Sequence, residues 1–482
     1  MTETLSFSSI APQSVIVMTA FVVIGIDLFV KKVERINITL TAFLGVVLAL
    51  ICVRSLSASY TTVFSGLILR DGISIYLDQL FLIGTAIVIL LSHRFAEFHA
   101  IPYSEFIVLI LFASLGMMMI SISSDLVILF IGIELLSLCL YVLTGFDKSS
   151  LTSGEASLKY FLLGAFSTGF LVYGMAFLFG VCRTSNLVVI GNAISAGGSA
   201  TPLLVLGFAL VLVGLGFKIS LVPFHMWAPD VYQGAPTPIT AWIATGSKMA
   251  GFIALIRIFS FPTISFEPFS DYWVQGIWWL AMLTMIVGNL GALVQNDIKR
   301  LLAYSSIAHG GYLSMAFVSH NLLGLQAMLF YLAAYMLMTL GAFGVVIVVR
   351  RNGQECRSLS DFSGLVKQRP VIAALMALFL FSLAGMPFTA GFVGKLWLFG
   401  AAIREGFYVL AAVGILTTLL SFYYYLRIVV FMYMQEPDET VQFDVIPLAG
   451  KLALGFAALG VLLLGIYPNL LWRVLVAQTI GL

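Results

Sequence analysis

The stretch Gly214-Leu-Gly-Phe-Lys218-Ile-Ser-Leu-Val-Pro223-Phe-His225 decides the fold, because it puts a lysine and a proline at the end of the apolar segment 202–222. Such a segment is long enough to cross the roughly 30 Å hydrocarbon core of a bilayer as a helix. A proline inside a helix leaves backbone groups free, and in a membrane only neighbouring protein or water can satisfy them. The stretch therefore predicts a broken transmembrane helix with a buried lysine beside the break.

The composition extends this interpretation to the whole chain. Its 482 residues are 61% hydrophobic and only 10% charged, and the mean hydropathy is +1.08. A soluble domain carries roughly 25% charged residues, so this chain has too little polar surface for a water-soluble globule. Long apolar runs recur along it, without the alternating segments of a β-barrel. We therefore expect an all-α integral membrane protein with about fourteen transmembrane helices.

A second break is expected at Ser382-Leu-Ala-Gly-Met-Pro387-Phe388. Paired breaks in two halves of a chain are typical of inverted repeats with an ion pathway between them. The lysines beside the breaks do not align, since Lys218 precedes its proline and Lys395 follows. The expected helices cover residues 11–30, 36–54, 74–92, 103–121, 124–146, 155–181, 202–222, 236–260, 274–295, 298–318, 322–349, 370–400, 405–434 and 449–469.

The two breaks divide the chain into parts. We expect an N-terminal three-helix segment at 1–100, a first five-helix repeat at 101–265, a second five-helix repeat at 266–435 and a C-terminal helix within 436–482. The two repeats are expected to be inverted with respect to each other.

Lysine and arginine are distributed unevenly between the two sides that this layout defines. One side has only Arg54, Arg70, Arg183, Arg404 and Arg473. The other side has Lys31, Lys32, Arg35, Arg94, Lys148, Lys159, Lys299, Arg300, Arg350, Arg351, Arg357, Lys367, Arg369 and Lys451. The positive-inside rule places the richer side in the cytoplasm. We therefore expect both termini outside.

Ionisable side chains inside the expected helices are the candidates for function. A charged Lys, Arg or Asp at a helix centre costs about 2.5–3.5 kcal/mol, so such groups must face water, each other or the dipoles of broken helices. His225, two residues after Pro223, and His309, within 298–318, are candidate relay residues, because histidine titrates near neutral pH. The candidates that lie well inside their segments are Glu134, Lys218, Lys248 and Lys395.

Other polar residues in the helices have a simpler interpretation. Asp27 lies four residues before Lys31, which favours a local pair on one helix face. Arg257 and Arg427 lie toward helix ends, from which their long side chains can reach the membrane surface. Tyr423-Tyr-Tyr425 is expected to contribute packing and an aromatic belt at the interface.

The residue types indicate proton transfer. A lysine taken out of water favours its neutral form, and a neighbouring carboxylate favours the charged form. Movement of Glu134 toward or away from Lys218 would therefore make the lysine take up or release a proton. No cofactor or metal is expected on this chain. Gly214-Leu-Gly216 has Ile219 in place of the third glycine of a dinucleotide fingerprint, and the four cysteines are isolated from one another.

The segment from Gly214 to Pro236, together with Glu134, Lys248 and Asn296-Asp-Ile-Lys-Arg-Leu-Leu-Ala-Tyr-Ser-Ser306, resembles the antiporter-like membrane subunits of respiratory complex I. The resemblance covers roughly residues 74–434. It implies a proton-translocating subunit of a bacterial inner-membrane NADH:quinone oxidoreductase. NADH oxidation and quinone reduction would occur on partner subunits, which are expected to hold the FMN, the iron–sulfur clusters and the quinone.

The resemblance also implies roles for individual residues. Glu134 matches the acid that modulates Lys218, Lys248 matches the central connecting lysine, and Lys395 matches the lysine of a second half-channel. His225 and His309 match segments that carry relay residues. The implied partners are other membrane-arm subunits, including other antiporter-like ones, and the lipid bilayer, with no nucleic acid. A subunit of a multisubunit cation/proton antiporter stays open as the alternative, as does a quinone-binding or purely structural membrane subunit.

Overall fold

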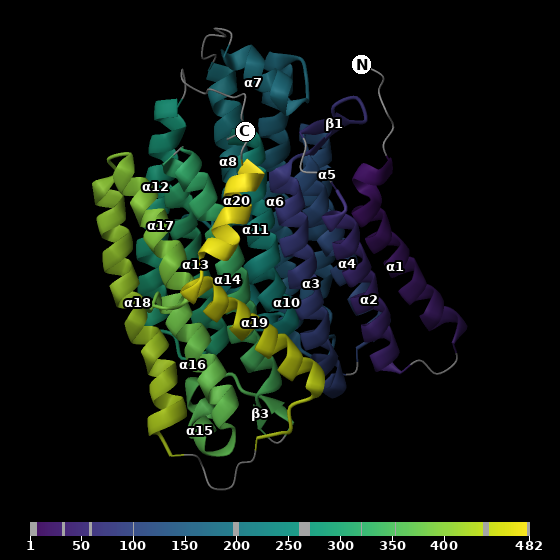
Figure 1. The fold of residues 1–482 in the computed structure, drawn as a ribbon, viewed down its shortest axis with the longest axis vertical. Helices are drawn as coiled ribbons and strands as arrows, with labels where there is room; N and C mark the ends of the chain where they lie inside the picture. Colours follow the sequence, from purple (N-terminus) through teal and green to yellow (C-terminus); the bar gives the residue numbers. More distant parts are fainter. Residues whose placement is uncertain are drawn as a thin grey trace.

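The computed structural model describes residues 7–30, 34–56, 60–99, 101–195, 202–259, 270–319, 321–351, 353–436 and 443–479. Long helices lie side by side along the long axis of the molecule (Figure 1). Among the described residues, 11 helices are long and apolar enough to cross a membrane. The all-α membrane fold expected from the composition is therefore confirmed.

Most of the expected segments form one helix each. In chain order the longer helices are α1 (Ala11–Phe29), α2 (Arg35–Arg54), α3 (Gly72–Phe98), α4 (Tyr103–Ile122), α5 (Leu126–Thr144), α6 (Leu151–Cys182), α8 (Pro202–Lys218), α11 (Lys248–Phe259), α12 (Ser270–Leu293), α13 (Ile298–Val318), α14 (Leu322–Val348), α16 (Pro370–Ala384), α17 (Ala390–Arg404), α18 (Tyr408–Met434) and α19 (Leu448–Ile466).

Short elements fill the connections. They are η1 (Phe7–Ile10), β1 (Thr61–Val63), β2 (Ile68–Arg70), α7 (Leu187–Ser195), α9 (Trp227–Gly234), α10 (Thr237–Trp242), η2 (Ile243–Ser247), β3 (Arg350–Arg351), β4 (Gln354–Glu355), η3 (Leu359–Phe362), α15 (Leu365–Gln368) and α20 (Asn469–Thr479). The strands form two antiparallel hairpins, β1–β2 and β3–β4. Figure 1 shows β1 at one end of the molecule, with both chain termini, and β3 and α15 at the other end.

Both expected breaks are present. The first separates α8, which ends at Lys218, from α9, and the second separates α16 from α17. At the second break Gly385 has a φ of +91° and Phe388 a φ of +67°, in the left-handed region that ends a helix. A third irregularity was not expected: η2 is a π-helical turn directly before Lys248. Such turns interrupt the regular α-helical hydrogen bonds and frequently mark functional sites.

The last expected helix, 449–469, corresponds to α19 (Leu448–Ile466). The sequence interpretation did not include α20, a separate short helix that begins after Pro468. Figure 1 shows α20 extending from α19 toward the β1 end. α19 ends before Pro468, because a proline lacks the N–H that would continue the helical hydrogen bonds.

The centre of the bundle is formed by α14, which is buried except in its first turn, and by the run α10–η2–α11, which is completely buried. α1 and α2 lie at the periphery, where most of their surface faces outward. Lys248 begins α11, and Tyr331 and Tyr335 lie on α14. The candidate lysine is therefore on one of the two most enclosed elements of the protein.

Arg257 does not reach the membrane surface, so that expectation was wrong. Its guanidinium is buried and donates two hydrogen bonds to the Asp71 carboxylate, at 2.7 and 2.9 Å, and two to the Ser121 carbonyl, at 2.6 and 3.0 Å. A planar guanidinium matches a carboxylate in this two-bond geometry. The pair fastens α11 to the start of α3.

Arg427 and Asp27 also bind protein groups. Arg427 donates to the Leu293 carbonyl at 3.3 Å and to the Gln295 carbonyl, which ties α18 to the end of α12. Asp27 accepts a hydrogen bond of 2.7 Å from Ser104. The partner expected for Asp27, Lys31, lies outside the described residues.

Candidate functional site

Lys218 is buried at the end of α8. Its ammonium donates to the Ser137 hydroxyl at 2.5 Å and to the Tyr141 hydroxyl at 3.4 Å, both on α5. Glu134 lies one turn before Ser137 on the same helix and accepts a hydrogen bond of 2.9 Å from Thr168 on α6. The predicted pair is thus placed on neighbouring helices, but no ion pair within 4.0 Å joins Glu134 to Lys218 in this structure.

Lys248 is 1% exposed and follows the π-helical turn. Its ammonium donates to the Ser306 carbonyl, and to the Ser306 hydroxyl at 2.6 Å. The Tyr335 hydroxyl donates to the same serine at 2.8 Å, and the Tyr232 hydroxyl lies 3.3 Å from it. Among the described residues no carboxylate forms an ion pair with Lys248, so neutral oxygens alone receive its hydrogen bonds.

His309 connects this group to a second one. It lies on α13, one turn after Ser305 and Ser306, and is buried. Its Nδ1 is 2.6 Å from the Tyr331 hydroxyl and its Nε2 is 3.2 Å from the Tyr425 hydroxyl. Tyr425 is also hydrogen-bonded to Ser305. Hydroxyl groups that both donate and accept therefore surround the imidazole, as proton transfer requires.

Lys395 lies on α17 (Ala390–Arg404), beside the ring of Tyr312. It is 3% exposed, and its ammonium donates to the carbonyls of Leu383 at 2.9 Å and Ala384 at 3.2 Å. These are the last carbonyls of α16, which the break leaves without helical partners. The ammonium is 4.9 Å from the centre of the Tyr312 ring, and that ring meets His309 edge-on with centroids 5.5 Å apart.

The structure thus brings three candidates into one buried region, in the order Lys248, His309, Lys395. Lys218 and Glu134 form a second group between α5, α6 and α8. His225 lies half-buried in the first break and takes no part in the hydrogen bonds of either group.

Sequence reasoning missed the tyrosines of this region. Tyr423 is 62% exposed, as an interfacial residue would be, but Tyr425 is 0% exposed and binds His309. Consecutive residues on an α-helix point about 100° apart, so Tyr423 and Tyr425 cannot share one face. That periodicity could have separated them. Tyr331 and Tyr335 are four residues apart on α14, so the same periodicity places them on one helix face.

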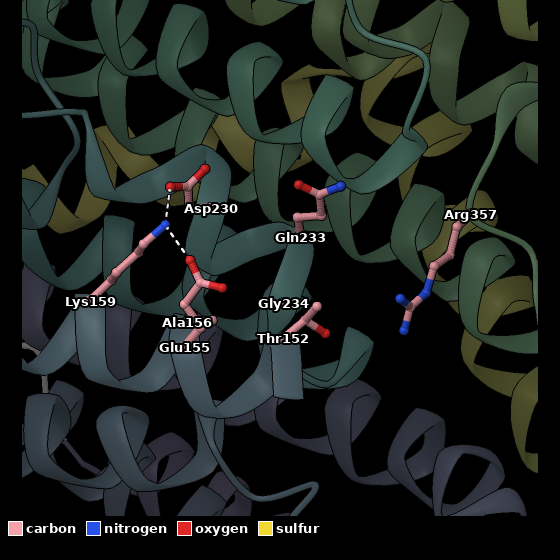
Figure 2. A pocket seen from close by; sticks show the side chains of 8 residues that line it. All are labelled: Thr152, Glu155, Ala156, Lys159, Asp230, Gln233, Gly234 and Arg357. Atoms are coloured by element: carbon pink, nitrogen blue, oxygen red, sulfur yellow. Dashed lines mark hydrogen bonds and ion pairs between the residues drawn. The ribbon is translucent and has the colours of Figure 1, made fainter. Parts of the chain in front are cut away.

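A polar pocket of about 200 Å³ opens at the Lys/Arg-rich end of the bundle, and Figure 2 shows its lining. Asp230 on α9 accepts hydrogen bonds from Lys159 at 2.8 Å and from Arg300 at 2.7 Å, which links α9 to α6 and α13. Lys159 also pairs with Glu155 at 2.8 Å. On its inner side, α9 carries Tyr232, which contacts Ser306. The short helix α9 therefore lines the open pocket with one face and contacts the Lys248 group with the other.

Lys299 is a further buried lysine, which the sequence analysis treated only as one of the charges on the Lys/Arg-rich side. Lys299, at the start of α13, donates to the Ala235 carbonyl at 2.6 Å. Burial raises the pKa of the nearby Glu355, whereas Lys299 and a hydrogen bond from Thr237 lower it, and the result lies below the ordinary value. These groups join the start of α13 to the β3–β4 hairpin.

The fold and the buried lysines define an antiporter-like membrane protein. Residues 123–421 match the family model described as NADH:quinone oxidoreductase/Mrp antiporter, transmembrane. NADH-quinone oxidoreductase subunit N of Trichlorobacter lovleyi is 39% identical over 470 residues, which cover 97% of this chain and 96% of the relative. Subunit N 2 of Rhizobium meliloti is 38% identical over 468 residues, with 97% and 96% covered. The chain belongs to the family of NADH-quinone oxidoreductase subunit N.

Solved structures agree with this assignment. A chain of respiratory complex I from Thermus thermophilus with bound aureothin is 32% identical, with a TM-score of 0.82 and with 96% of this chain and 98% of that chain covered. A chain of the Mrp complex from a Dietzia species has a TM-score of 0.83 at 21% identity, with 98% and 96% covered, which indicates a shared fold. The chain is therefore an antiporter-like subunit of a complex I, an oxidoreductase of several subunits.

Proposed function

We propose that this chain is a membrane-arm subunit that translocates protons and performs no redox chemistry of its own. NADH oxidation and quinone reduction would take place on partner subunits, which would hold the FMN, the iron–sulfur clusters and the quinone. The proposed partners include other antiporter-like subunits of the membrane arm. One observation carries the proposal: Lys248, His309 and Lys395 are buried in one polar region, and none forms an ion pair with a carboxylate among the described residues.

The arrangement supports proton transfer by its chemistry. A buried ammonium without a counter-ion is costly, so the neutral amine competes with it and a small change in surroundings shifts the balance. The Lys248 ammonium donates to the Ser306 hydroxyl, which also accepts a hydrogen bond from the Tyr335 hydroxyl. A second set of hydrogen bonds joins Ser305, Tyr425 and His309, and the ring centroids of His309 and Tyr335 lie 5.2 Å apart. Among the described residues no hydrogen bond joins the two sets or links His309 to Lys395, and the Tyr312 ring contacts both His309 and Lys395. A conformational step at these gaps would therefore control transfer.

We propose that Glu134 modulates Lys218, as the first site of the path, and that His225 serves as a relay at the break. Glu134 is held by Thr168 on α6, away from Lys218. A rotation that released it would bring its charge closer to the ammonium, which would then retain its proton. Ser137, one turn along α5, already accepts from Lys218 and would guide that approach.

Exchange of Glu134 tests this function. In proteoliposomes that contain the whole complex, we expect Glu134→Ala to lower NADH-driven proton translocation by about tenfold, because a positioned proton-transfer group contributes about 10²–10⁴ to a rate. Glu134→Asp should retain part of the activity, since it keeps the carboxylate. Glu155→Gln, which removes an exposed acid on α6, is the matched control and should leave translocation unchanged. Normal translocation in Glu134→Ala would reduce the residue to a structural polar group.

We propose that both termini face the outside and that the Arg350–Arg369 loop faces the cytoplasm, with the parts 1–100, 101–265, 266–435 and 436–482 as described above. The distribution of lysine and arginine supports this orientation. The two breaks, at matching places in 101–265 and 266–435, support two repeats.

Reporter fusions test the orientation. A reporter active only in the cytoplasm is expected to give signal when fused after Arg357, because that loop belongs to the side rich in positive charge. The same reporter fused before Met1 should be silent. Signals in the reverse order would overturn the orientation and the direction assigned to the path.

A subunit of a multisubunit cation/proton antiporter is the alternative function. The shared fold with the Mrp complex favours it, whereas the relatives named as subunit N favour the main proposal. Co-purification distinguishes the two. Polypeptides that carry flavin and iron–sulfur clusters should copurify with this chain if it works in an NADH:quinone oxidoreductase.

A further inference from the structure

A groove runs along the start of α3 at the β1 end of the bundle, flanked by α2 and α20. Its volume is about 380 Å³, which is in the range of ligand sites. Most of its lining is aliphatic and its polar side chains are Arg54, Tyr76, Gln79 and Gln478. A groove with few polar groups on apolar walls suits a ligand that is itself mostly apolar.

The position of the groove relative to the bilayer follows from α2. This helix has 20 residues, from Arg35 to Arg54, with no charged residue between its ends. At 1.5 Å per residue it is about 30 Å long, the thickness of the hydrocarbon core. Arg54 therefore lies at the level of the lipid headgroups. Along α3 the groove descends from Ile75 to Ile83, about 12 Å into the hydrocarbon region.

Polar groups without a protein partner converge on this groove. Arg54 is exposed and Gln79 is partly buried, and neither side chain makes a hydrogen bond or ion pair with a described residue. The Oε1 atom of Gln478 is buried and has no hydrogen-bond partner. A buried amide without a hydrogen-bond partner destabilises the protein, because it has lost its hydrogen bonds to water. A ligand that brings its own polar atoms would relieve this cost.

We propose that the groove binds one phospholipid with an anionic headgroup. Its phosphate would pair with Arg54, at the headgroup level, and its ester and glycerol oxygens would meet the amides of Gln79 and Gln478. An acyl chain would follow the aliphatic wall past Leu80 to Ile83. Each part of the ligand then matches a part of the lining at the depth where a bilayer already presents it.

The lipid also has a structural consequence. α2 and α20 both pack on α3, and the groove separates them. α20 approaches α3 so closely that a Cβ on Gly72 would lie 2.2 Å from the Gln478 carbonyl oxygen. A lipid in the groove would support the end of α20 from its open side. The site is independent of proton translocation.

Lipid retention by the purified complex tests the proposal. The complex is reconstituted with phosphatidylglycerol, washed in detergent and analysed by native mass spectrometry. We expect Arg54→Gln to lose one retained phosphatidylglycerol relative to the natural chain. Arg473→Gln is the control: it removes an exposed arginine on α20 that does not line the groove, and this variant should lose no phosphatidylglycerol. Ile83→Trp, which fills the deep end, should also lose one, whereas phosphatidylcholine should be retained weakly by all forms.

Four results would overturn the proposal. Equal retention by Arg54→Gln and the natural chain would mean that no headgroup binds there. Equal losses in Arg54→Gln and Arg473→Gln would indicate general attraction of anionic lipid. Displacement by inorganic phosphate alone, or cross-linking of a Leu80→Cys variant to another polypeptide, would assign the groove to a free anion or to a partner helix.

Discussion

Replacing Lys248 with methionine is expected to abolish most of the NADH-driven proton translocation of the complex, by about tenfold or more, while the complex still assembles. The ammonium is 1% exposed and bonded only to Ser306, so this charge is a burden on stability. Replacing buried charges by apolar groups of similar volume is often neutral or stabilising. Methionine has nearly the shape of lysine and removes the amine proposed to carry the proton.

Two further variants complete this test, which is read as acidification inside vesicles that contain the complex. Lys248→Arg keeps the charge but cannot release a proton, so it should fail as well. Lys451→Met removes an exposed lysine of α19 and should translocate normally. Full translocation by Lys248→Met would remove Lys248 from the path and, with it, the central argument for the proposed function.

The membrane fold could be predicted from the sequence because the thickness of the bilayer fixes the length of an apolar helix. The same rule exposed both breaks, since Pro223 and Pro387 fall where an apolar segment should continue. The π-helical turn before Lys248 left no such signal, because it depends on how α10 and α11 pack in the centre. The short helix α20 escaped the same rule, because its 11 residues are fewer than a membrane span needs and include Asn469 and Arg473.

In the candidate site too, some residues could be predicted from the sequence and others could not. Lysine in a membrane is rare enough that Lys218, Lys248 and Lys395 stood out by residue type alone. Tyrosine is common at membrane interfaces, so Tyr425 could not be distinguished from a belt residue without its partner. Arg257 was misjudged because its partner Asp71 is 186 residues away in sequence. Residue type thus identifies what is unusual in a membrane, and tertiary contacts decide whether it is paired.

The hydrogen bonds of the buried region bear on how transfer would be controlled. They form two sets, one of Lys248, Ser306, Tyr335 and Tyr232 and one of His309, Tyr331, Tyr425 and Ser305, which meet through the rings of Tyr335 and His309. Among the described residues no hydrogen bond joins the two sets, or joins His309 to Lys395. Lys395 is meanwhile fixed to the carbonyls of Leu383 and Ala384. A proton could reach Lys395 only if the side chain left those carbonyls or if water entered beside Tyr312. If Lys395 carries protons as proposed, the broken helix holds it in a closed position, and its release is the expected controlled step.

Lys395→Arg is expected to impair proton translocation by about tenfold, as is Lys395→Ala. Lys395 does not extend to the membrane surface, because its side chain is buried and its ammonium binds the last carbonyls of α16. A structural role remains the competing explanation, since a cation at a helix C-terminus stabilises the unpaired carbonyls. Arginine separates the two, because it can donate to the same carbonyls and keeps the charge but cannot deprotonate.

Both variants are measured in the vesicle assay described for Lys248, alongside the thermal stability of the purified complex. If Lys395 only caps α16, Lys395→Arg should translocate normally and Lys395→Ala should lose stability, by about 1–2 kcal/mol for a lost cation at a helix end. If Lys395 carries protons, Lys395→Arg should keep the stability and lose the translocation. Normal translocation by Lys395→Arg would end the path at His309 and move its outlet to another part of the bundle.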